Sequence, residues 1–313
     1  MSIPVAVFAF NRPAHVARTL ASLERCAGLA QFVLHCYCDG SRGPQEEAAV
    51  VQTRAVVRAW SERHPVRIIE RERNLGLFGS VVSGVTELCA QYGRCIVIED
   101  DLTVSPDFLE YMRMALDRYE DATEVYQISG FMFPVEHPTR PDAFFLPLTT
   151  TWGWATWHRA WTRFEASADE ARARLADPET RRRFDLEDSY PYSAMLEQRL
   201  ASGNDSWGIL WWWSVFRAGG LVLHPRQTLV RNEGFDGSGT HCTSLAAADR
   251  EMEIGLRCSD PARPLAWPVQ IATDAAALSR VKAYLAAQHR PSLVGRLRRS
   301  VRRYLGRGAN RVA

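Results

Sequence analysis

Short apolar runs alternate with helix-like segments through the first third of the chain, and this alternation limits the fold more than any other feature of the sequence. The runs are apolar at nearly every position, which is typical of parallel strands buried on both faces, whereas the segments between them repeat apolar residues at helical spacing. Such alternation predicts an α/β fold with a mostly parallel, twisted sheet and helices on both faces. The predicted strands span residues 4–10, 32–38, 66–69 and 95–98.

Polar residues follow each predicted strand. Because the carboxyl ends of parallel strands lie along one edge of a sheet, side chains from all four strand ends should meet there, where such sheets bind their ligands. The sequence contains neither a GxGxxG nor a GxxxxGK[ST] motif, so neither a dinucleotide-binding fold nor a P-loop is indicated. The residues at the strand ends are Asn11, Arg12, Asp39, Gly40, Arg73, Asn74, Glu99, Asp100 and Asp101.

Glu99, Asp100 and Asp101 follow the fourth predicted strand without interruption. Three adjacent carboxylates repel one another unless a cation or hydrogen-bond donors compensate their charge. A divalent ion held there would bridge a pyrophosphate and neutralise the charge that develops on a leaving nucleotide. The alternative is a solvated acidic turn before a helix, for which Ser105 and Pro106 predict the N-cap and first residue, with the helix running through residue 119.

Eight of the ten tryptophans lie between residues 152 and 213. Indole rings can stack on the apolar faces of sugars, although large aromatic side chains more often belong to a core. Trp152 and Trp154 alternate as in a strand, which would place both rings on one face, and together with Trp207 they are candidates for an acceptor site. The tryptophans at 211–213 would point in three directions from a helix, so most of them are expected to pack inside.

Charge and apolar content are those of an ordinary globular protein, with 46% hydrophobic residues, 24% charged residues and a net charge of +2. The apolar start of the chain lacks a basic region and does not predict a signal peptide, and no apolar run approaches the roughly 20 residues of a membrane span. The seven cysteines form no CxxC pair, and Cys36 and Cys38 are expected in the core. These features predict a cytoplasmic protein in a reducing compartment.

Four segments of the first half occur in a fixed order: VFAFNRP, YCDGSRG, RNLGLFGSVVSG and IVIEDDLTVSPDF. As an ordered set they resemble the GT-A fold glycosyltransferases, both the inverting family 2 type and the N-acetylglucosaminyltransferase I type, in which EDD replaces the usual DxD. The second half adds TTTWGWATWHRAW, NDSWGILWWW and RNEGFDGSGTH, a set that is similar to a bacterial branch of polysaccharide-building transferases. The resemblance covers roughly residues 3 to 245.

The resemblance implies a role for most of the strand-end residues. Asp101 would bind Mn²⁺ or Mg²⁺ directly, Asp100 would assist at the ribose or sugar of the donor, and Asp39 would hold the base or ribose. Capping and turn roles are the alternatives, since Asp39 with Gly40 is a common turn pair and Asn74 also suits a turn. The other residues that the resemblance places around the nucleotide are Asn11, Arg12, Arg73 and Asn74.

Asp205 and His241 are the candidates for chemistry in the second half. By the same resemblance, a carboxylate just before a tryptophan is the general base that accepts a proton from the acceptor hydroxyl in an inverting displacement. Related sequences often carry a second acid after the tryptophan, where this chain has Gly208, and a helix N-cap is the alternative role for Asp205. His241, in a glycine-rich loop, would be a further metal ligand, or else a structural or solvent-exposed histidine.

The expected organisation is one GT-A domain over residues 1–270, with a nucleotide-sugar-binding half at 1–135 and an acceptor-binding half at 136–270. A helical tail is expected at 271–313, and from Arg290 onward it carries eight arginines and no acidic residue. Its apolar stripe suits peripheral contact with the inner face of an anionic membrane. The stripe would equally suit packing on the domain, and nothing else in the sequence supports nucleic-acid binding.

The sequence thus predicts an inverting, divalent-metal-dependent hexosyl or N-acetylhexosaminyl transferase that takes a sugar from a nucleotide-diphosphate donor, with UDP expected, to a glycan or lipid-linked acceptor in polysaccharide biosynthesis. A sugar-nucleotide pyrophosphorylase would need a GxGTR-type loop after the first strand, where this chain has FNRP. A non-catalytic sugar-nucleotide-binding protein is the other alternative, and the presence of Asp101, Asp205 and His241 argues against it.

Overall fold

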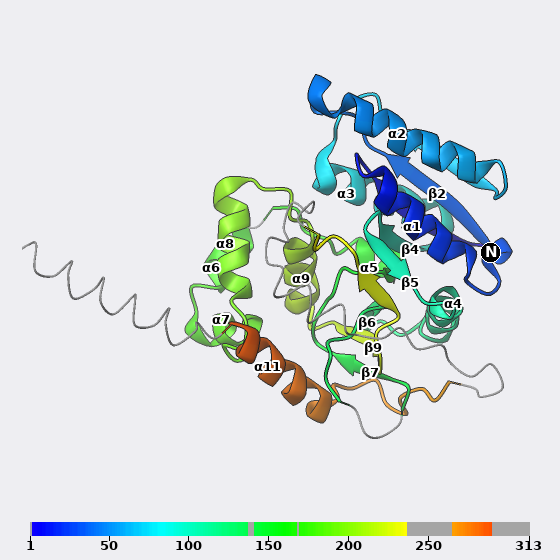
Figure 1. The fold of residues 1–313 in the computed structure, drawn as a ribbon. Coiled ribbons are helices and arrows are strands. Elements are labelled where there is room, and N and C mark those ends of the chain that lie inside the picture. Colours follow the sequence, from blue (N-terminus) through cyan, green and yellow to red (C-terminus); the bar gives the residue numbers. More distant parts are fainter. Residues whose placement is uncertain (1, 137–140, 168, 237–264, 290–313) are drawn as a thin grey trace, which may run out of the picture.

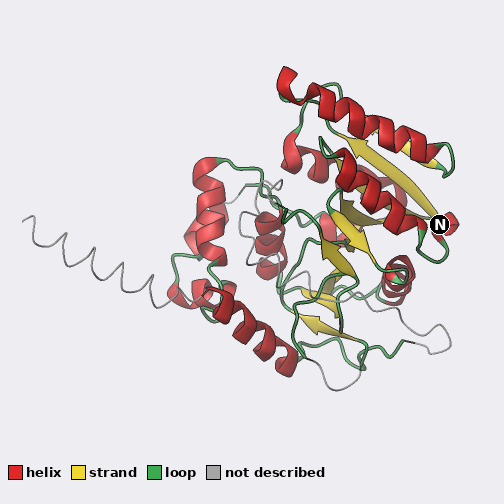
Figure 2. Ribbon diagram, in the orientation of Figure 1, coloured by secondary structure: helices red, strands yellow, loops and turns green. Residues whose placement is uncertain are grey.

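The computed structural model describes residues 2–136, 141–167, 169–236 and 265–289, which form a large sheet flanked by helices (Figure 1, Figure 2). The strand order in this sheet is β3-β2-β1-β4-β8-β6-β9-β7. The fold is the α/β GT-A architecture that the sequence predicts. The strands are β1 (Ile3–Ala9), β2 (Phe32–Cys38), β3 (Val66–Glu70), β4 (Arg94–Glu99), β6 (Val125–Ser129), β7 (Ala143–Leu146), β8 (Trp154–Trp157) and β9 (Leu221–Pro225), while β5 (Leu102–Val104) and β10 (Val230–Asn232) form a separate pair.

The half of the sheet formed by β3, β2, β1 and β4 is parallel throughout, as expected from the apolar runs. All seven residues of β1 are buried, and its side chains alternate between two cores. Val5 and Val7 belong to the core under α1 (Pro13–Glu24) and α2 (Pro44–Ser61), whereas Phe8 belongs to the core under α3 (Gly76–Tyr92). A central strand covered on both faces has no polar side, which is why its sequence is continuously apolar.

The second half of the sheet is joined through β8, which pairs antiparallel with both β4 and β6. Two successive antiparallel pairings make β6 run in the same direction as β4, and β9 is parallel to β6. The carboxyl ends of β1, β2, β4, β6 and β9 therefore all lie at one edge of the sheet. The start of β8 reaches the same edge, because β8 runs the opposite way.

Helices that follow the first half of the chain pack into two further parts of the core. The indole rings of Trp161 in α5 and Trp211 in α9 pack with α3 in one core, and α7, α8 and α9 pack with β7 in another. Cys36 and Cys38 are buried, as predicted, and no thiol among the described residues is in a disulfide. The remaining helices are α4 (Phe108–Arg118), α5 (His158–Trp161), α6 (Asp169–Arg174), α7 (Pro178–Phe184), α8 (Tyr192–Ser202), α9 (Gly208–Arg217) and α11 (Ala275–His289), with a 3₁₀ turn at Leu29–Gln31.

Helix α11 belongs to the packed body of the protein. Ala277, Val281 and Leu285 lie one helical turn apart and are buried in the core next to β7. The core therefore extends past residue 270, where the sequence places the end of the domain. No helix among the described residues is long and apolar enough to cross a membrane. The arginine-rich segment from residue 290 lies outside the described residues.

Two local predictions are wrong. Helix α4 begins at Phe108, and Ser105 with Pro106 precedes it in a turn in which the Phe108 N–H donates to the carbonyl of Ser105. Trp152 and Trp154 do not share a face, because Gly153 between them has a φ of +59° and interrupts the strand alternation. The Trp154 ring enters the core of α3 and α9, while the Trp152 ring packs against the opposite core.

Trp154 should be a major contributor to stability. Its side chain is fully buried, and its ring contacts the rings of Trp161, Trp207 and Trp211. Trp154→Ala should lower the free energy of unfolding by about 3–5 kcal/mol, because the cavity cannot close between such rigid neighbours. Urea unfolding measures this loss, and Trp154→Phe is the control, which should lose clearly less. A loss below about 1 kcal/mol for the alanine variant would contradict the packing described.

Candidate active site

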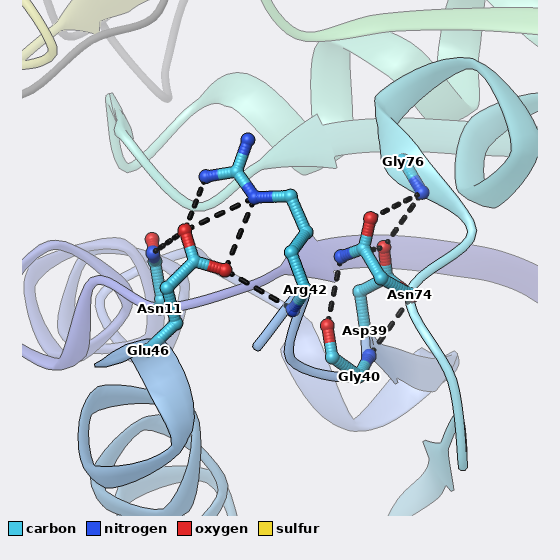
Figure 3. A network of polar contacts seen from close by, with 7 residues as sticks. All are labelled: Asn11, Asp39, Gly40, Arg42, Glu46, Asn74 and Gly76. Carbon is cyan, nitrogen blue, oxygen red and sulfur yellow. Dashed lines mark hydrogen bonds and ion pairs between the residues drawn. The ribbon is translucent and has the colours of Figure 1, made fainter. Parts of the chain in front are cut away.

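The loops that follow β1, β2, β3 and β4 meet at the carboxyl edge of the sheet, where the sequence places them. Asp39 is the centre of the contacts between the loops after β2 and β3 (Figure 3). Its Oδ1 accepts hydrogen bonds from the N–H groups of Gly40 and Leu75, both at 2.9 Å. Its Oδ2 accepts from the Gly76 N–H and from Nδ2 of Asn74, both at 3.0 Å. The carboxylate thus occupies the N-terminus of α3, a favoured place for an anion.

The turn roles considered for Asp39 and Asn74 are present in the structure. Asn74 also donates to the carbonyl of Gly40 at 2.7 Å, so the two loops are held together from both sides. A Cβ at Gly40 would lie 2.5 Å from the backbone carbonyl carbon of Arg73, which explains why glycine is needed there. The side chain of Arg73 is exposed beside this junction. Asp39 therefore fixes the shape of the junction between these two loops; a direct role at the nucleotide stays a prediction.

Arg42 and Glu46 add a charged pair to this edge that the sequence analysis missed. Arg42 Nε donates to Glu46 Oε1 at 3.0 Å, and Nδ2 of Asn11 reaches the same carboxylate at 3.5 Å (Figure 3). The guanidinium also lies over the ring of Phe10, with its carbon 5.1 Å from the ring centroid. The i,i+4 spacing of Arg42 and Glu46 was the available signal. Only the structure shows that the pair faces the loop after β1.

Arg12 forms ion pairs with two of the three adjacent acids. Its Nη1 donates to Asp101 Oδ2 at 2.9 Å, and its Nη2 donates to Asp100 Oδ1. Asp100 Oδ2 accepts from the Phe10 N–H at 3.2 Å, so both oxygens of this buried carboxylate are engaged. The sequence predicts Arg12 at the nucleotide and Asp101 at a metal. The structure brings the two side chains together.

Burial and mutual repulsion shift the pKa values of this cluster. Burial and the charges of Asp101 and Asp100 raise the pKa of Glu99 to about 8. Burial likewise raises the pKa of Asp100, although Arg12 opposes that shift. Burial alone would lower the pKa of Arg12, but Asp100 and Asp101 together raise it above its usual range, so the guanidinium stays charged. The positively charged Arg12 guanidinium is therefore a constant part of the acid cluster.

Asp101 could bind a divalent ion, but the described residues do not surround such an ion with several acidic ligands. Among the described residues no group of three His, Cys, Asp or Glu side chains converges on one point. Asp101 Oδ1 has no hydrogen-bond partner within the described ranges, and the side chain is 14% exposed, so one carboxylate oxygen is open. Mg²⁺ and its relatives commonly bind through one or two carboxylates together with substrate phosphates and water. The residues present fit an ion that is held mainly by a phosphorylated ligand.

Asp205 lies at the same edge although it comes from the second half of the chain. A Cβ at Gly76 would be 2.7 Å from Asp205 Oδ2, so the exposed carboxylate lies directly against the loop that Asp39 holds. Gly76 has a φ of +70°, which favours glycine independently of this contact. The N-cap of α9 is Trp207, and no side chain caps that helix. The capping alternative for Asp205 is therefore wrong.

Trp207 connects the Asp205 loop to the acid cluster. Its side chain lies near enough to Glu99 to lower the pKa of that carboxyl, against the larger raising effect of burial, and its ring stacks on Trp154 at 5.2 Å between centroids. Trp154 and Trp207 are 0% and 2% exposed, so other indole rings cover the faces that a sugar would need. The prediction that these two rings bind the acceptor is corrected accordingly: both belong to the core.

Trp152 remains at the edge and is only partly buried. Its ring packs edge-on against Phe131 and Phe235, with centroids 4.6 Å and 5.7 Å away. Phe131 follows β6, and the N–H of Gly130 donates to the carbonyl of Gly153 at 2.6 Å, which fixes Trp152 near the carboxyl end of that strand. An aromatic surface thus lies on the second-half side of the site.

The segment after β10 runs past Asp101. The Glu233 N–H donates to the carbonyl of Asp101 at 2.7 Å, and a Cβ at Gly234 would lie 2.5 Å from Asp101 Oδ2. Farther along, Asp236 Oδ2 is 3.1 Å from Nε2 of the buried His15. This glycine and this contact are further site features that the sequence analysis missed. His241 lies outside the described residues, and its role as a metal ligand stays a prediction.

The first half of the chain matches a known protein family. The sequence model described as glycosyl transferase family 2 matches residues 5–169, just over half of the 313 residues. This match includes β1 to β4, the acid cluster and the start of the second half.

Comparison with solved structures finds distant similarities. The chain is similar to an S. aureus TarS fragment of residues 1–349, with 11% identity, 75% of this chain and 61% of that chain covered, and a TM-score of 0.44. It is also similar to GalNAc-T7 crystallised with UDP, GalNAc and Mn²⁺, with 11% identity, coverage of 72% and 43%, and a TM-score of 0.45. An active-site mutant of LgtC has 12% identity, coverage of 80% and 95%, and a TM-score of 0.41. The chain spans about three fifths of the TarS fragment.

Proposed function

The chain belongs to glycosyl transferase family 2, and on that premise we propose that it transfers a sugar from a nucleoside-diphosphate donor to a hydroxyl of a glycan or lipid-linked acceptor, with inversion at the anomeric carbon. The observation that carries the proposal is that acidic side chains from both halves meet at one edge of the sheet. Asp39 and Asp101 follow β2 and β4, and Asp205 precedes α9 but lies against Gly76. A donor bound between the strand ends would have this third carboxylate beside it.

The donor nucleotide is assigned to the strand ends of the first half. Asp39 fixes the wall formed by residues 74–76, and its place at the N-terminus of α3 keeps that wall rigid. Asn11 and Arg73 lie on the loops to either side, with Arg73 exposed for contact with phosphate or base. Arginine and backbone N–H groups are well suited to bind phosphate oxygens. Asp100 anchors Arg12 and does not face the donor sugar in this proposal.

Asp205 is assigned the role of general base. The acceptor hydroxyl would form its bond to the anomeric carbon while the bond from that carbon to the diphosphate oxygen breaks, and Asp205 would take the hydroxyl proton. A single displacement of this kind inverts the anomeric configuration. Trp152, beside Phe131, offers an aromatic surface for the acceptor on the second-half side. The membrane contact expected of the tail concerns residues outside the described ranges and stays a prediction.

Mn²⁺ or Mg²⁺ is the cofactor that the proposal includes, held by Asp101 together with phosphate oxygens of the donor. When bound, the ion would neutralise negative charge on the departing nucleoside diphosphate. The open oxygen of Asp101 supports this assignment, and His241 is the second protein ligand that the sequence suggests.

A panel of nucleotide sugars, measured by thermal shift with and without Mn²⁺, tests the donor class. A ligand at about 100 times its dissociation constant stabilises the folded state by about 2.7 kcal/mol, so the matching donor should raise the melting temperature clearly. We expect UDP-sugars with Mn²⁺ to give the largest shift and nucleoside monophosphates to give little. If no nucleotide sugar shifts the melting temperature, either with or without Mn²⁺, the proposed function is wrong. Turnover of the stabilising donor with an acceptor then separates an enzyme from a non-catalytic binding protein.

A further inference from the structure

Arg12 forms an ion pair with Asp101, the carboxylate to which the proposed function assigns a divalent ion. We propose that Arg12 is the resident cation of the acid cluster in the free protein, and that a divalent ion binds Asp101 only together with a nucleoside diphosphate, toward which the Arg12 guanidinium then turns. The inference rests on the proposed function, because it concerns the same donor site. It adds an ordered coupling between metal and nucleotide, with Arg12 as the residue that positions both.

The contacts of Asp100 and Asp101 differ: the ion pair between Arg12 and Asp100 is fixed, whereas the ion pair between Arg12 and Asp101 can be exchanged. Asp100 is anchored by the Phe10 N–H, and its side chain is only 4% exposed, so its ion pair with Arg12 has no alternative arrangement in reach. Asp101 has one open oxygen and touches Arg12 through a single contact at 2.9 Å. Arg12 itself is 21% exposed and lies on the solvent side of both acids. The guanidinium can therefore leave Asp101 while it stays paired with Asp100.

Charge explains why the metal alone should bind weakly. Arg12 is the only described cation within ion-pair distance of Asp100 and Asp101, and its single positive charge offsets part of their negative charge. A divalent ion on Asp101 would lie a few ångströms from the guanidinium and be repelled by it. A nucleoside diphosphate adds negative charge at the same place, and its phosphate oxygens suit an arginine fork. Metal and diphosphate should consequently strengthen each other's binding by the same factor.

The wild-type protein provides the first measurement. Calorimetric titration with Mn²⁺ should give weak binding alone and binding on the order of 10- to 100-fold tighter in saturating UDP, which is within the usual range for coupled sites. The monophosphate UMP should give a much smaller gain, because it lacks the second phosphate. Equal Mn²⁺ affinity with and without UDP would overturn the proposal.

Replacing Arg12 provides the second measurement, with the electron paramagnetic resonance signal of free Mn²⁺ as a readout that needs no turnover. Without nucleotide, Arg12→Gln should bind Mn²⁺ about tenfold more tightly than wild type, and the gain from UDP should shrink. Arg12→Lys keeps the positive charge and should bind Mn²⁺ as weakly as wild type does. Arg25→Gln is the matched control at the other end of α1: Arg25 is exposed, its side chain donates to the carbonyl of Ala21, and its loss changes the net charge equally.

The outcomes separate this inference from the proposed function. If Mn²⁺ binds wild type and Arg12→Gln equally well and UDP binding is intact, the proposed exchange between Arg12 and the metal at Asp101 is wrong. The proposed transferase function would not be affected by that result. Absence of Mn²⁺ binding in every variant, even with UDP, would contradict the metal-dependent function itself. Circular dichroism and melting temperature show whether Arg12→Gln is folded, and should it unfold, the wild-type titrations with UDP and UMP still decide the proposal.

Discussion

Asp205→Asn should slow sugar transfer by about 10² to 10⁴ while leaving donor binding almost unchanged. The substitution preserves the size of the side chain but removes its ability to accept a proton, and general base catalysis contributes a factor of that order. A base acts on the acceptor hydroxyl in the transition state, so its loss lowers the rate constant more than it changes ground-state affinity. Single-turnover rates with saturating donor, together with calorimetric donor affinity, measure the two effects separately.

The surroundings of Asp205 make this prediction specific. The carboxylate is exposed and caps no helix, so the variant should keep its melting temperature, since surface substitutions of this kind usually change stability by less than about 0.5 kcal/mol. Glu197→Gln is the matched control, because Glu197 is an exposed acid of α8 that pairs with Arg181 away from the strand ends. It should retain wild-type rates. Near-normal turnover in Asp205→Asn, or a product with retained anomeric configuration in its NMR coupling constant, would contradict the assignment.

The first half of the fold could be predicted from the sequence because its strands depend on local pattern. β1, β2 and β4 are largely apolar runs, and such runs are typical of strands in the middle of a sheet that is covered on both faces. β3 forms the edge next to β2. The same pattern placed Asn11, Asp39 and Asp101 at one edge without any knowledge of contacts, because strand direction alone determines that edge.

The second half could not be predicted in the same way, because its strands take their places from distant partners. β8 is only four residues long and lies between β4 and β6, which no local pattern specifies. The φ of +59° at Gly153 then reversed the expected face of Trp152 relative to Trp154. Glycine permits both signs of φ, so its conformation is decided by tertiary packing and not by its neighbours in sequence.

Roles within the site were harder to predict than positions. Arg12, Asp100 and Asp101 were each expected at the donor, yet their pairing depends on side-chain reach across loops that the sequence separates by almost ninety residues. Buried charges are seldom left unpaired, so the EDD acids called for a compensating cation. The sequence predicts a metal ion as that cation, whereas in the structure the guanidinium of Arg12 pairs with Asp100 and Asp101.

Asp101→Asn should remove the metal-dependent part of UDP affinity, a loss on the order of 10- to 100-fold, which is the factor by which Mn²⁺ and UDP should strengthen each other's binding. Calorimetry with UDP in the presence and absence of Mn²⁺ measures that part directly. In wild type the two affinities should differ, and in the variant they should coincide at the metal-free value. The amide keeps the volume of the side chain and one oxygen for Arg12, so nucleotide contacts made by the protein itself should survive.

The structure indicates that this loss would not come from misfolding. Arg12 keeps its pair with Asp100 when Asp101 loses its charge, and Asp100 keeps the Phe10 N–H, so no buried charge is left alone. Glu233→Gln is the control, because Glu233 lies next to Asp101 and its carboxylate accepts only a hydrogen bond from Thr103 among the described residues. That variant should keep the full Mn²⁺ effect. If Asp101→Asn kept it as well, the ion would bind elsewhere, and the open oxygen of Asp101 would have no part in holding the donor.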